Sequence, residues 1–497
     1  MARQSKGALL STLKLDVSAR TPLYRQLEDS IRRIIIDGEL ATGQQLPASR
    51  QLANDLGISR LTVKNAYEQL VSEKFLVTRP GAGTFVAHIS SAEVVLTFEQ
   101  TNDGESNNPV LSERAVTISR SRSVSRLGGT TAFRPGVPAL DQFPQSAWAS
   151  TYSRVLRQSG TCSLGYGSPG GDVELKNAVA NHVRDHRGVK VDPEQIIITA
   201  GAQQAFVLIA FTLLNPGDIV WCEDPGHIAG RDAMRLFGAD VKSVGIDAEG
   251  LDIELAKSSH TDAQLIFLTP SHQQPLGITM SLDRRMQIIK YAKTHNSWLV
   301  EDDYDSEFVY EGRAQPAMQC LDNRSQILYV GSFSKTLFPG LRLGYLIAPP
   351  VMVEAFSVAQ TLMSQNVSVI LQKTLARFIE EGAYNAHIRR MRTLYASRRD
   401  CLYENLYRYC EDLFQINKPN AGMHLIAWAR NHSVRDQAVC ESIWQQGIDC
   451  LPVSMYCDQV KMDPGIMLGF ACAPENEIEE KVLKMAQAVR MVMKENI

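Results

Sequence analysis

Apolar runs of strand length alternate with helical periods over most of the chain from about Glu194 onward. Segments such as Asp283 to His295, which carry apolar residues on one helical face, separate these runs. Strands that alternate with helices are typical of a mainly parallel sheet covered by helices on both faces. The runs expected to form the sheet are Ile196–Ile198, Asp218 to Cys222, Leu265 to Leu268, Trp298 to Val300, Ile327 to Val330 and Leu343 to Ile347.

The pattern changes on either side of this region. After about residue 375 a long amphipathic helix precedes two short apolar runs, Met423 to Trp428 and Ile466 to Phe470, which predict a smaller α+β lobe. Residues between His88 and about Thr130 are poor in large apolar side chains and cannot bury enough surface to fold alone. We therefore expect a head at 14–88, a linker at 89–130 and a body at 131–497, with a large lobe at about 180–375 and a small lobe at about 376–497.

Two short amphipathic segments joined by Gly57 predict a helix-turn-helix in the head. Ser49 and Ser59 are suited to cap the two helices. The second helix of this motif lies in the major groove of DNA, and its N-terminal end here carries Arg60, Thr62 and Lys64 away from the apolar face. The following segment, VTRPGAGTFV, predicts a hairpin with a small tip that can approach a nucleic-acid backbone. A helical protein-docking module with a solvated basic face is the alternative.

Composition and charge narrow the class of protein. Of the 497 residues, 44% are hydrophobic and 21% are charged, which excludes disorder throughout. The longest nearly uncharged apolar run, Ala205 to Leu214, is shorter than the ~20 residues that span a bilayer. The N-terminus lacks an apolar stretch like that of a signal peptide, and the nine cysteines form no metal-binding pattern. We therefore expect a cytoplasmic protein with no membrane partner and no metal.

The charge is unevenly spread along the chain. The formal net charge is −3, yet residues 1–88 hold 12 Lys and Arg against 8 Asp and Glu. A small basic head on a larger acidic body indicates that the two parts have different tasks.

The segment GSFSKTLFPGLRLGY, residues 331–345, contains groups suited to a covalently bound cofactor. Lys335 lies among small hydroxyl residues, and Arg342 follows seven positions later. A cofactor aldehyde reacts with a lysine amine, and a phosphate dianion needs hydroxyls and a guanidinium. Ser332, Ser334 and Arg342 supply those groups around Lys335. A solvent-facing lysine in a loop is the alternative.

Upstream, WLVEDDYDSEF places a cluster of acids at the end of a predicted strand. A carboxylate there can pair with a pyridinium nitrogen, and a tyrosine two residues later can bind a ring hydroxyl. A divalent-metal site of the D-x-D kind and a solvated acidic loop are the alternatives. The lysine thirty-three residues further on favours the cofactor.

Two further strand ends carry polar groups. In IIITAGAQQAF a strand ends near Gly201 and a helix begins, so the backbone N–H groups of Ala202 and Gln203 are candidate phosphate donors. In LTPSHQQPLG another strand end carries His272 and Gln273. Ligands of open parallel sheets bind outside the carboxyl ends of the strands, where all these segments are expected to meet.

The head resembles the GntR-family winged helix over nearly all of residues 20–87. The matching phrases are PLYRQL, LPASR, LGISRLTVKNAY and GAGTFV. The resemblance implies a double-stranded DNA operator as partner. By it, Arg50, Arg60 and Lys64 contact bases or phosphates, and Arg79 and Gly83 lie on the wing.

The body resembles fold-type-I aminotransferases from about residue 130 to 490. More narrowly it is similar to the MocR/GabR-type subfamily of GntR regulators, which joins this winged helix to an aminotransferase-like domain. TPSHQQPLG, EDDYDSEF, GSFSKTLFPGLRLGY and HIRRMRTLYASRRD match the subfamily. The implied fold is multidomain, with a winged helix-turn-helix followed by an α/β aminotransferase-like domain that has a smaller α+β lobe. The implied cofactor is pyridoxal 5'-phosphate.

The resemblance also implies a role for individual residues. Lys335 is the Schiff-base lysine, Asp302 the pyridinium partner and Tyr304 the ligand of the ring hydroxyl. Tyr166 matches a tyrosine that reaches the phosphate of the neighbouring subunit, which implies a head-to-tail, domain-swapped homodimer. The phosphate ligands are Ser332, Ser334 and Arg342.

Three positions depart from the subfamily. His227 stands where a tyrosine usually stacks on the cofactor ring. Met467 and Ala229 stand where arginines bind a substrate carboxylate. We therefore expect a regulator, not an enzyme, that senses pyridoxal phosphate or a small amino compound through a Schiff-base site, with no catalytic residues and with residual half-transamination left open. A working aminotransferase with an accessory DNA-binding head and a GntR repressor that has lost the cofactor are the alternatives.

Overall fold

The structure is a computed structural model that describes residues 13, 15–19, 21–87, 111–119, 131–321 and 326–495. These residues fall into two compact units, a head within residues 1–109 and a body within residues 110–497. Most of the linker expected at 89–130 lies outside the described residues, but residues 113–119 of it form a short helix, α4 (Glu113–Ser119), within the body. Among the described residues, no helix has the length and apolar character needed to cross a membrane.

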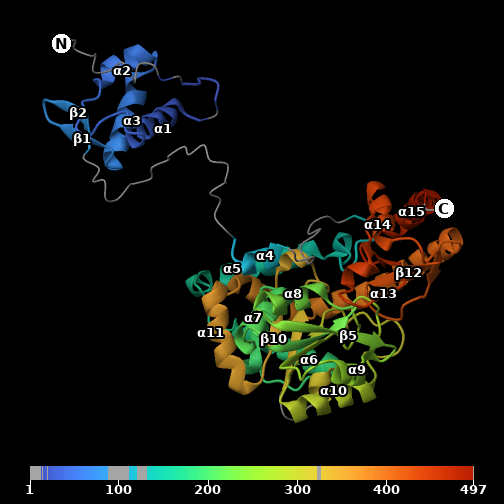
Figure 1. The fold of residues 1–497 in the computed structure, drawn as a ribbon. Coiled ribbons are helices and arrows are strands. Elements are labelled where there is room, and N and C mark those ends of the chain that lie inside the picture. The colour runs from blue at the N-terminus through green and yellow to red at the C-terminus, as the bar shows by residue number, and fades with distance from the viewer. Residues whose placement is uncertain are drawn as a thin grey trace. The chain divides into compact units, whose positions relative to one another are not determined.

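The head is a three-helix domain with a β-hairpin wing (Figure 1). Gly57 ends α2 in the left-handed conformation at φ +66°, and the Ser59 hydroxyl accepts the Thr62 N–H at 3.0 Å as the cap of α3. The cap predicted at Ser49 is wrong, because Ala48 holds the cap position of α2 and Ser49 is the first helical residue. The elements are α1 (Leu23–Ile36), α2 (Ser49–Leu56), α3 (Arg60–Ser72), β1 (Leu76–Arg79) and β2 (Gly83–Val86).

The large lobe of the body is built on one eight-stranded sheet of order β3-β10-β9-β8-β7-β4-β5-β6. The pairs β9–β8, β8–β7, β7–β4 and β4–β5 are parallel, whereas β10 runs antiparallel to both of its neighbours. The strands are β3 (Ile196–Thr199), β4 (Ile219–Asp224), β5 (Asp240–Asp247), β6 (Gly250–Leu251), β7 (Leu265–Leu268), β8 (Trp298–Asp303), β9 (Ile327–Ser332) and β10 (Gly344–Ile347).

Helices cover both faces of this sheet, as Figure 1 shows. Alternate side chains of the central strands enter different cores: Val330 packs among residues of α7, α8 and α11, while Leu299 packs among residues of α9 and α10. A central strand that is buried on both faces appears in the sequence as a continuous apolar run. The helices are α5 (Gln145–Gln158), α6 (Val173–Arg187), α7 (Ala202–Leu213), α8 (Ile228–Leu236), α9 (Ile253–Ser259), α10 (Leu282–His295), α11 (Val353–Ser364) and α12 (Val369–Glu380).

The small lobe holds a four-stranded antiparallel sheet of order β11-β12-β14-β13 beside long helices. Both apolar runs expected there form strands, β12 and β14. The elements are α13 (Ala383–Cys410), β11 (Phe414–Ile416), β12 (His424–Ala429), α14 (Asp436–Gln445), β13 (Leu451–Pro452), β14 (Gly465–Gly469) and α15 (Glu475–Glu495). The predicted sheet and its second lobe are therefore confirmed, and only β5 and the two-residue β6 had no predicted counterpart in the large sheet.

Candidate functional site

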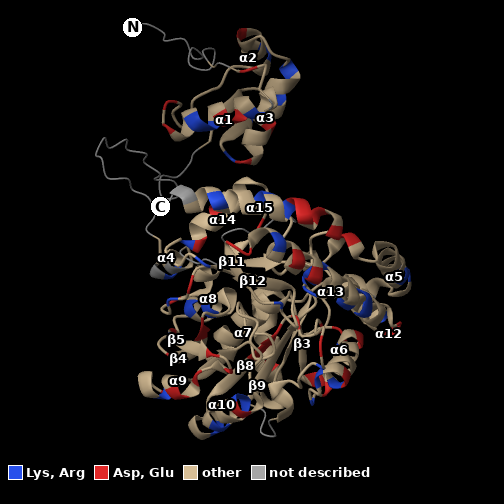
Figure 2. Ribbon diagram, turned by 90° about the vertical axis from the view of Figure 1, so that its right-hand side faces the viewer, with Lys and Arg blue, Asp and Glu red and all other residues tan. Residues whose placement is uncertain are grey.

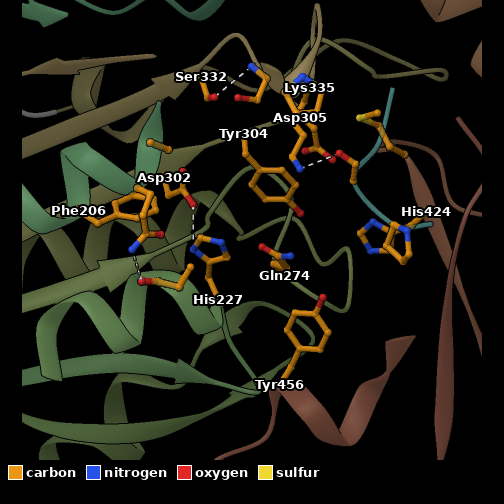
Figure 3. Close-up of a pocket in the computed structure, with 18 of the residues that line it drawn as sticks. Phe206, His227, Gln274, Asp302, Tyr304, Asp305, Ser332, Lys335, His424 and Tyr456 are labelled. Atoms are coloured by element: carbon orange, nitrogen blue, oxygen red, sulfur yellow. Dashed lines mark hydrogen bonds and ion pairs between the residues drawn. The ribbon is translucent and has the colours of Figure 1, made fainter. Parts of the chain in front are cut away.

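A cavity of about 270 Å³ lies in the body, where the carboxyl ends of β4, β8 and β9 meet residues of the small lobe. Figure 3 shows side chains from both lobes converging on it. Its lining residues are Pro135, Gly136, Ala202, Gln203, Phe206, His227, Ala229, Gln274, Asp302, Tyr304, Asp305, Ser332, Ser334, Lys335, Pro339, Arg342, Met423, His424, Tyr456 and Met467.

Lys335 follows β9 and points into this cavity. Its Nζ donates to the Gly136 carbonyl at 2.8 Å. A Cβ at position 136 would lie 2.6 Å from that nitrogen, so a side chain there would displace the lysine amine. Burial lowers the pKa of the Lys335 amine, although the Asp305 and Asp302 carboxylates oppose this effect. A lowered pKa increases the fraction of neutral amine, which is the nucleophilic form.

Asp302 is the last residue but one of β8 and lies in the interior of the protein, where only 3% of its surface is exposed. Burial raises the pKa of its carboxyl well above the usual value, and the nearby Asp303 and Asp305 carboxylates add to the effect. The carboxylate faces His227, whose Nδ1 lies 3.5 Å from Asp302 Oδ2. Burial, with Lys335 and Arg231 nearby, lowers the pKa of His227 to about 3, so the imidazole is neutral. A cationic ring nitrogen beside Asp302 would stabilise its charged form.

Polar groups at the start of α7 face those after β9. Gly201 precedes α7 with φ +88°, and a Cβ built on it would lie 3.6 Å from the Arg342 guanidinium. Ser332 and Ser334 belong to the same wall, and the Ser334 N–H donates to the Ser332 hydroxyl at 3.2 Å. Helix N-terminal N–H groups, two hydroxyls and a guanidinium form a set of donors suited to a phosphate dianion.

Nine of the twelve predicted cofactor residues line the cavity together: Lys335, Asp302, Tyr304, Ser332, Ser334, Arg342, Ala202, Gln203 and His227. The other three, His272, Gln273 and Tyr166, do not line it. Gln273 instead links the turn after β7 to the segment after β4, because its side-chain amide donates to the Pro225 carbonyl at 2.8 Å. Tyr166 is 80% exposed, and its predicted contact with a second subunit stays a prediction.

Other lining residues were absent from the prediction. Gln274 lines the cavity directly, and the only sequence signal was its place beside His272 and Gln273 in the same strand-end turn. Met423, His424 and Tyr456 come from the small lobe, and no motif marked them.

The part of the cavity near the small lobe has no arginine among its described lining residues. Met467 and Ala229, which replace the expected arginines, both line the cavity. Arg231 does not substitute for them: its Nη1 lies 3.9 Å from Asp224 Oδ1 and donates to the Tyr456 carbonyl at 3.4 Å. Burial lowers the pKa of His424 to about 4, so that imidazole adds no charge.

The head displays the predicted DNA-contact residues on its surface. Arg50, Arg60, Lys64, Arg79 and Gly83 are exposed. Figure 2 marks the basic positions of the head among its helices. Thr62 is half-buried, and its hydroxyl lies 2.9 Å from that of Ser59, so part of its role is to cap α3. The Arg79 guanidinium lies 4.8 Å from the centre of the Phe85 ring, which holds it at the wing.

Comparisons with known proteins agree with both units. The family model of aminotransferase class I and II matches residues 136–480, and that of bacterial regulatory proteins of the gntR family matches residues 23–86. A solved structure of the kynurenine aminotransferase of Pyrococcus horikoshii superposes with a TM-score of 0.69 at 25% identity, covering 77% of this chain and 97% of that one.

Full-length regulators are also similar to the chain. It is 35% identical over 476 residues to the probable rhizopine catabolism regulatory protein MocR of Rhizobium meliloti, covering 96% of this chain and 95% of the relative. It is 31% identical over 473 residues to the pyridoxine biosynthesis transcriptional regulator PdxR of Corynebacterium glutamicum, covering 95% and 97%. Because these matches run through the winged helix and the aminotransferase-like domain together, this chain belongs to the MocR-type subfamily of GntR-family transcriptional regulators.

Proposed function

We propose that the chain is a transcription regulator that binds operator DNA through its head and pyridoxal 5'-phosphate through Lys335 in its body. The observation that carries this proposal is the placement of three groups in one cavity: the Lys335 amine, the buried Asp302 carboxylate and the Arg342 guanidinium. Together they match the aldehyde, the ring nitrogen and the phosphate of this cofactor.

The cavity fits the cofactor by the chemistry of its donors. Ser332, Ser334, Arg342 and the start of α7 would hold the phosphate, and Tyr304 would hold the ring hydroxyl. His227 keeps a neutral, flat ring near Asp302, in edge contact with Phe206 at 5.5 Å between ring centres. When bound, the cofactor supplies an aldehyde that reacts with amines and a ring whose light absorption reports that reaction.

We propose further that the effector lacks the carboxylate anchor of an ordinary amino acid. A buried carboxylate without a charged partner is costly, and the described wall near Met467 and Ala229 offers no cation for it. The cofactor itself, or an amine whose remaining part is apolar, fits this wall. One relative is named for the regulation of pyridoxine biosynthesis and another for rhizopine catabolism, so members of the subfamily regulate different processes.

The same cavity leaves an aminotransferase activity as the second candidate, because the aminotransferase fold is retained. Sustained turnover with amino donors and a keto acid would favour that candidate.

We also propose a head-to-tail, domain-swapped homodimer in which Tyr166 contributes to the neighbouring site, since the side chain is exposed and outside the cavity of its own chain. Analytical ultracentrifugation of Tyr166→Phe and the natural protein, with cofactor titration, tests this arrangement.

The proposed function is tested by adding pyridoxal phosphate to cofactor-free protein. A visible absorption band that forms with one equivalent, together with binding of an operator fragment, is the expected result. A protein that binds the operator but takes up no cofactor would instead be a GntR regulator with an unused aminotransferase-like body.

A further inference from the structure

His272 lies behind the cavity wall. It follows β7, only 4% of its surface is exposed, and it is absent from the lining. Its Nδ1 lies 3.0 Å from Asp305 Oδ2 and 3.1 Å from the Tyr304 hydroxyl oxygen. The Tyr304 hydroxyl in turn donates to the backbone carbonyl of His272 at 2.9 Å. His272 therefore contacts the Tyr304 oxygen with its ring and accepts the hydrogen bond of the Tyr304 hydroxyl with its backbone carbonyl.

The proton positions follow from these partners. The Asp305 carboxylate only accepts hydrogen bonds when ionised, so His272 Nδ1 carries a proton. Burial disfavours a charged imidazole, yet the Asp305 carboxylate raises the pKa of His272 above its usual value. The Nδ1 proton is thus directed at Asp305 and at the Tyr304 oxygen. The Tyr304 hydroxyl can therefore redirect its hydrogen bond from the His272 carbonyl to a ligand, while its oxygen still accepts from His272 Nδ1.

The imidazole is also held by glycines of both lobes. A Cβ at Gly277, in the same turn, would lie 3.0 Å from His272 Nε2. A Cβ at Gly422, in the small lobe, would lie 2.0 Å from His272 Cε1. The ring therefore fills a space that exists only because neither residue has a side chain.

The small lobe is tied to the same place by its backbone. The Gly422 N–H donates to the Phe308 carbonyl at 2.9 Å, and Phe308 follows Asp305 in the chain. The His424 ring, 5.4 Å from the His272 ring, contacts the Pro275 carbonyl through Nε2 at 2.9 Å. The position of His272 and that of the small lobe are consequently linked by direct contact.

We propose that His272 is a positioning residue that orients the Tyr304 hydroxyl for the cofactor and joins it to the small lobe through Gly422. This inference rests on the proposed function, because Tyr304 needs a cofactor hydroxyl to bind. It assigns to His272 a supporting role in place of the direct cofactor contact expected from the sequence.

The test compares His272→Asn with His272→Gln. An asparagine amide places its N–H near the position of Nδ1, whereas a glutamine amide places it near Nε2. We expect H272Q to bind pyridoxal phosphate about tenfold more weakly than H272N, since it lacks the hydrogen bond behind Tyr304. We also expect H272Q, unlike H272N, to shift the absorption maximum of the bound cofactor, because the Tyr304 hydroxyl that contacts the ring hydroxyl of the cofactor changes its orientation. Equal affinity and equal spectra in the two variants would overturn the proposal.

A second pair of variants covers the case in which H272Q does not fold. Gly422→Ala pushes a methyl group into the imidazole, while Gly382→Ala introduces the same residue at a matching φ with nothing within 4 Å. Gly422 has φ +80° and Gly382 has φ +79°, so the backbone penalty is alike. G422A should shift the cofactor spectrum and G382A should not, and identical spectra would overturn the proposal. If the natural protein itself takes up no cofactor, the proposed function fails instead.

Discussion

Arg231 Nη1 lies 3.9 Å from Asp224 Oδ1, in a buried pair beside the cavity wall. Asp224 also accepts the backbone N–H groups of Asp458, Gln459 and Val460 at 2.8 Å each, so this carboxylate is fixed in place. Arg231, four residues after His227, therefore holds the two lobes together, and the described lining near the small lobe has no arginine for an effector carboxylate.

Met467→Arg should place an arginine in this part of the cavity. Met467 lines the cavity, where its sulfur accepts the Tyr456 hydroxyl at 3.9 Å, so a guanidinium at this position can face a bound carboxylate. We expect M467R to respond to glycine, alanine or γ-aminobutyrate with a change in cofactor absorbance, at concentrations about tenfold or more below those that affect the natural protein. Met455→Arg, on a half-buried residue outside the lining, is the matched control. A natural protein that already responds at low concentration, and loses the response in Arg231→Ala, would contradict our interpretation.

Lys335→Ala should abolish covalent attachment of the cofactor and leave the fold intact, because among the described residues the amine donates only to the Gly136 carbonyl. Borohydride reduction of the natural protein with bound cofactor should label the peptide that contains residue 335. Circular dichroism of both proteins checks the fold, and Lys257→Ala, on the exposed face of α9, serves as control. A label on any other lysine would refute the assignment.

The sequence predicted much of this site, because several of its residues lie close together along the chain. Lys335, the serines and Arg342 lie within one strand-end segment, so their spacing alone brought them together. Gln274 was missed in favour of Gln273 because two adjacent glutamines differ only in the direction that the turn gives each side chain. Tyr456 and His424 were unpredictable, since the packing of the small lobe on the sheet brings them to the cavity.

The same difference between local sequence signals and tertiary packing explains which strands and caps were predicted. Central strands such as β7 were recognised as apolar runs because both of their faces are buried. Strand β5 was missed because polar residues interrupt it: it reads DVKSVGID and is only partly buried. The cap at Ser49 failed because Ala48 enters the helix in an extended conformation without a side-chain acceptor.

Attachment of the cofactor should depend on pH through Lys335. Burial disfavours the ammonium and lowers the pKa of Lys335 below the usual lysine value, so the neutral amine becomes more abundant as pH rises through a midpoint below that value. The rate of absorbance change after mixing with pyridoxal phosphate should therefore increase with pH and level off earlier than the rate of a free alkylamine measured in parallel. A profile that coincides with that of the free amine would mean that burial does not tune this lysine.

Arg60→Ala and Lys64→Ala should each weaken operator binding without changing cofactor absorbance, because the two residues lie in a different unit from the cavity. Loss of a base-reading arginine costs about 1–3 kcal/mol, and loss of a phosphate contact mainly reduces the salt dependence. Glu68 lies 3.4 Å from Lys64, so Glu68→Ala is a useful opposite control that should preserve or strengthen binding. Unchanged affinity and salt slope in both basic variants would place the DNA surface elsewhere.

The last prediction concerns the signal itself. If the cofactor is the effector, pyridoxal phosphate alone should change the operator affinity of cofactor-free protein, and the operator should change cofactor affinity by the same factor, because coupling between two sites is reciprocal. Fluorescence anisotropy with an operator fragment measures one side of this cycle, and absorbance titration measures the other. Lys335→Ala should lose the response while still binding DNA, since the lysine lies in the cavity and not in the head. If cofactor alone has no effect and an amine without a carboxylate changes both measurements, the amine is the effector and Lys335 its receptor. If only amino acids with a free carboxylate act, a cation outside the described lining binds them, and the reading of Met467 and Ala229 as the determinants of effector class is wrong.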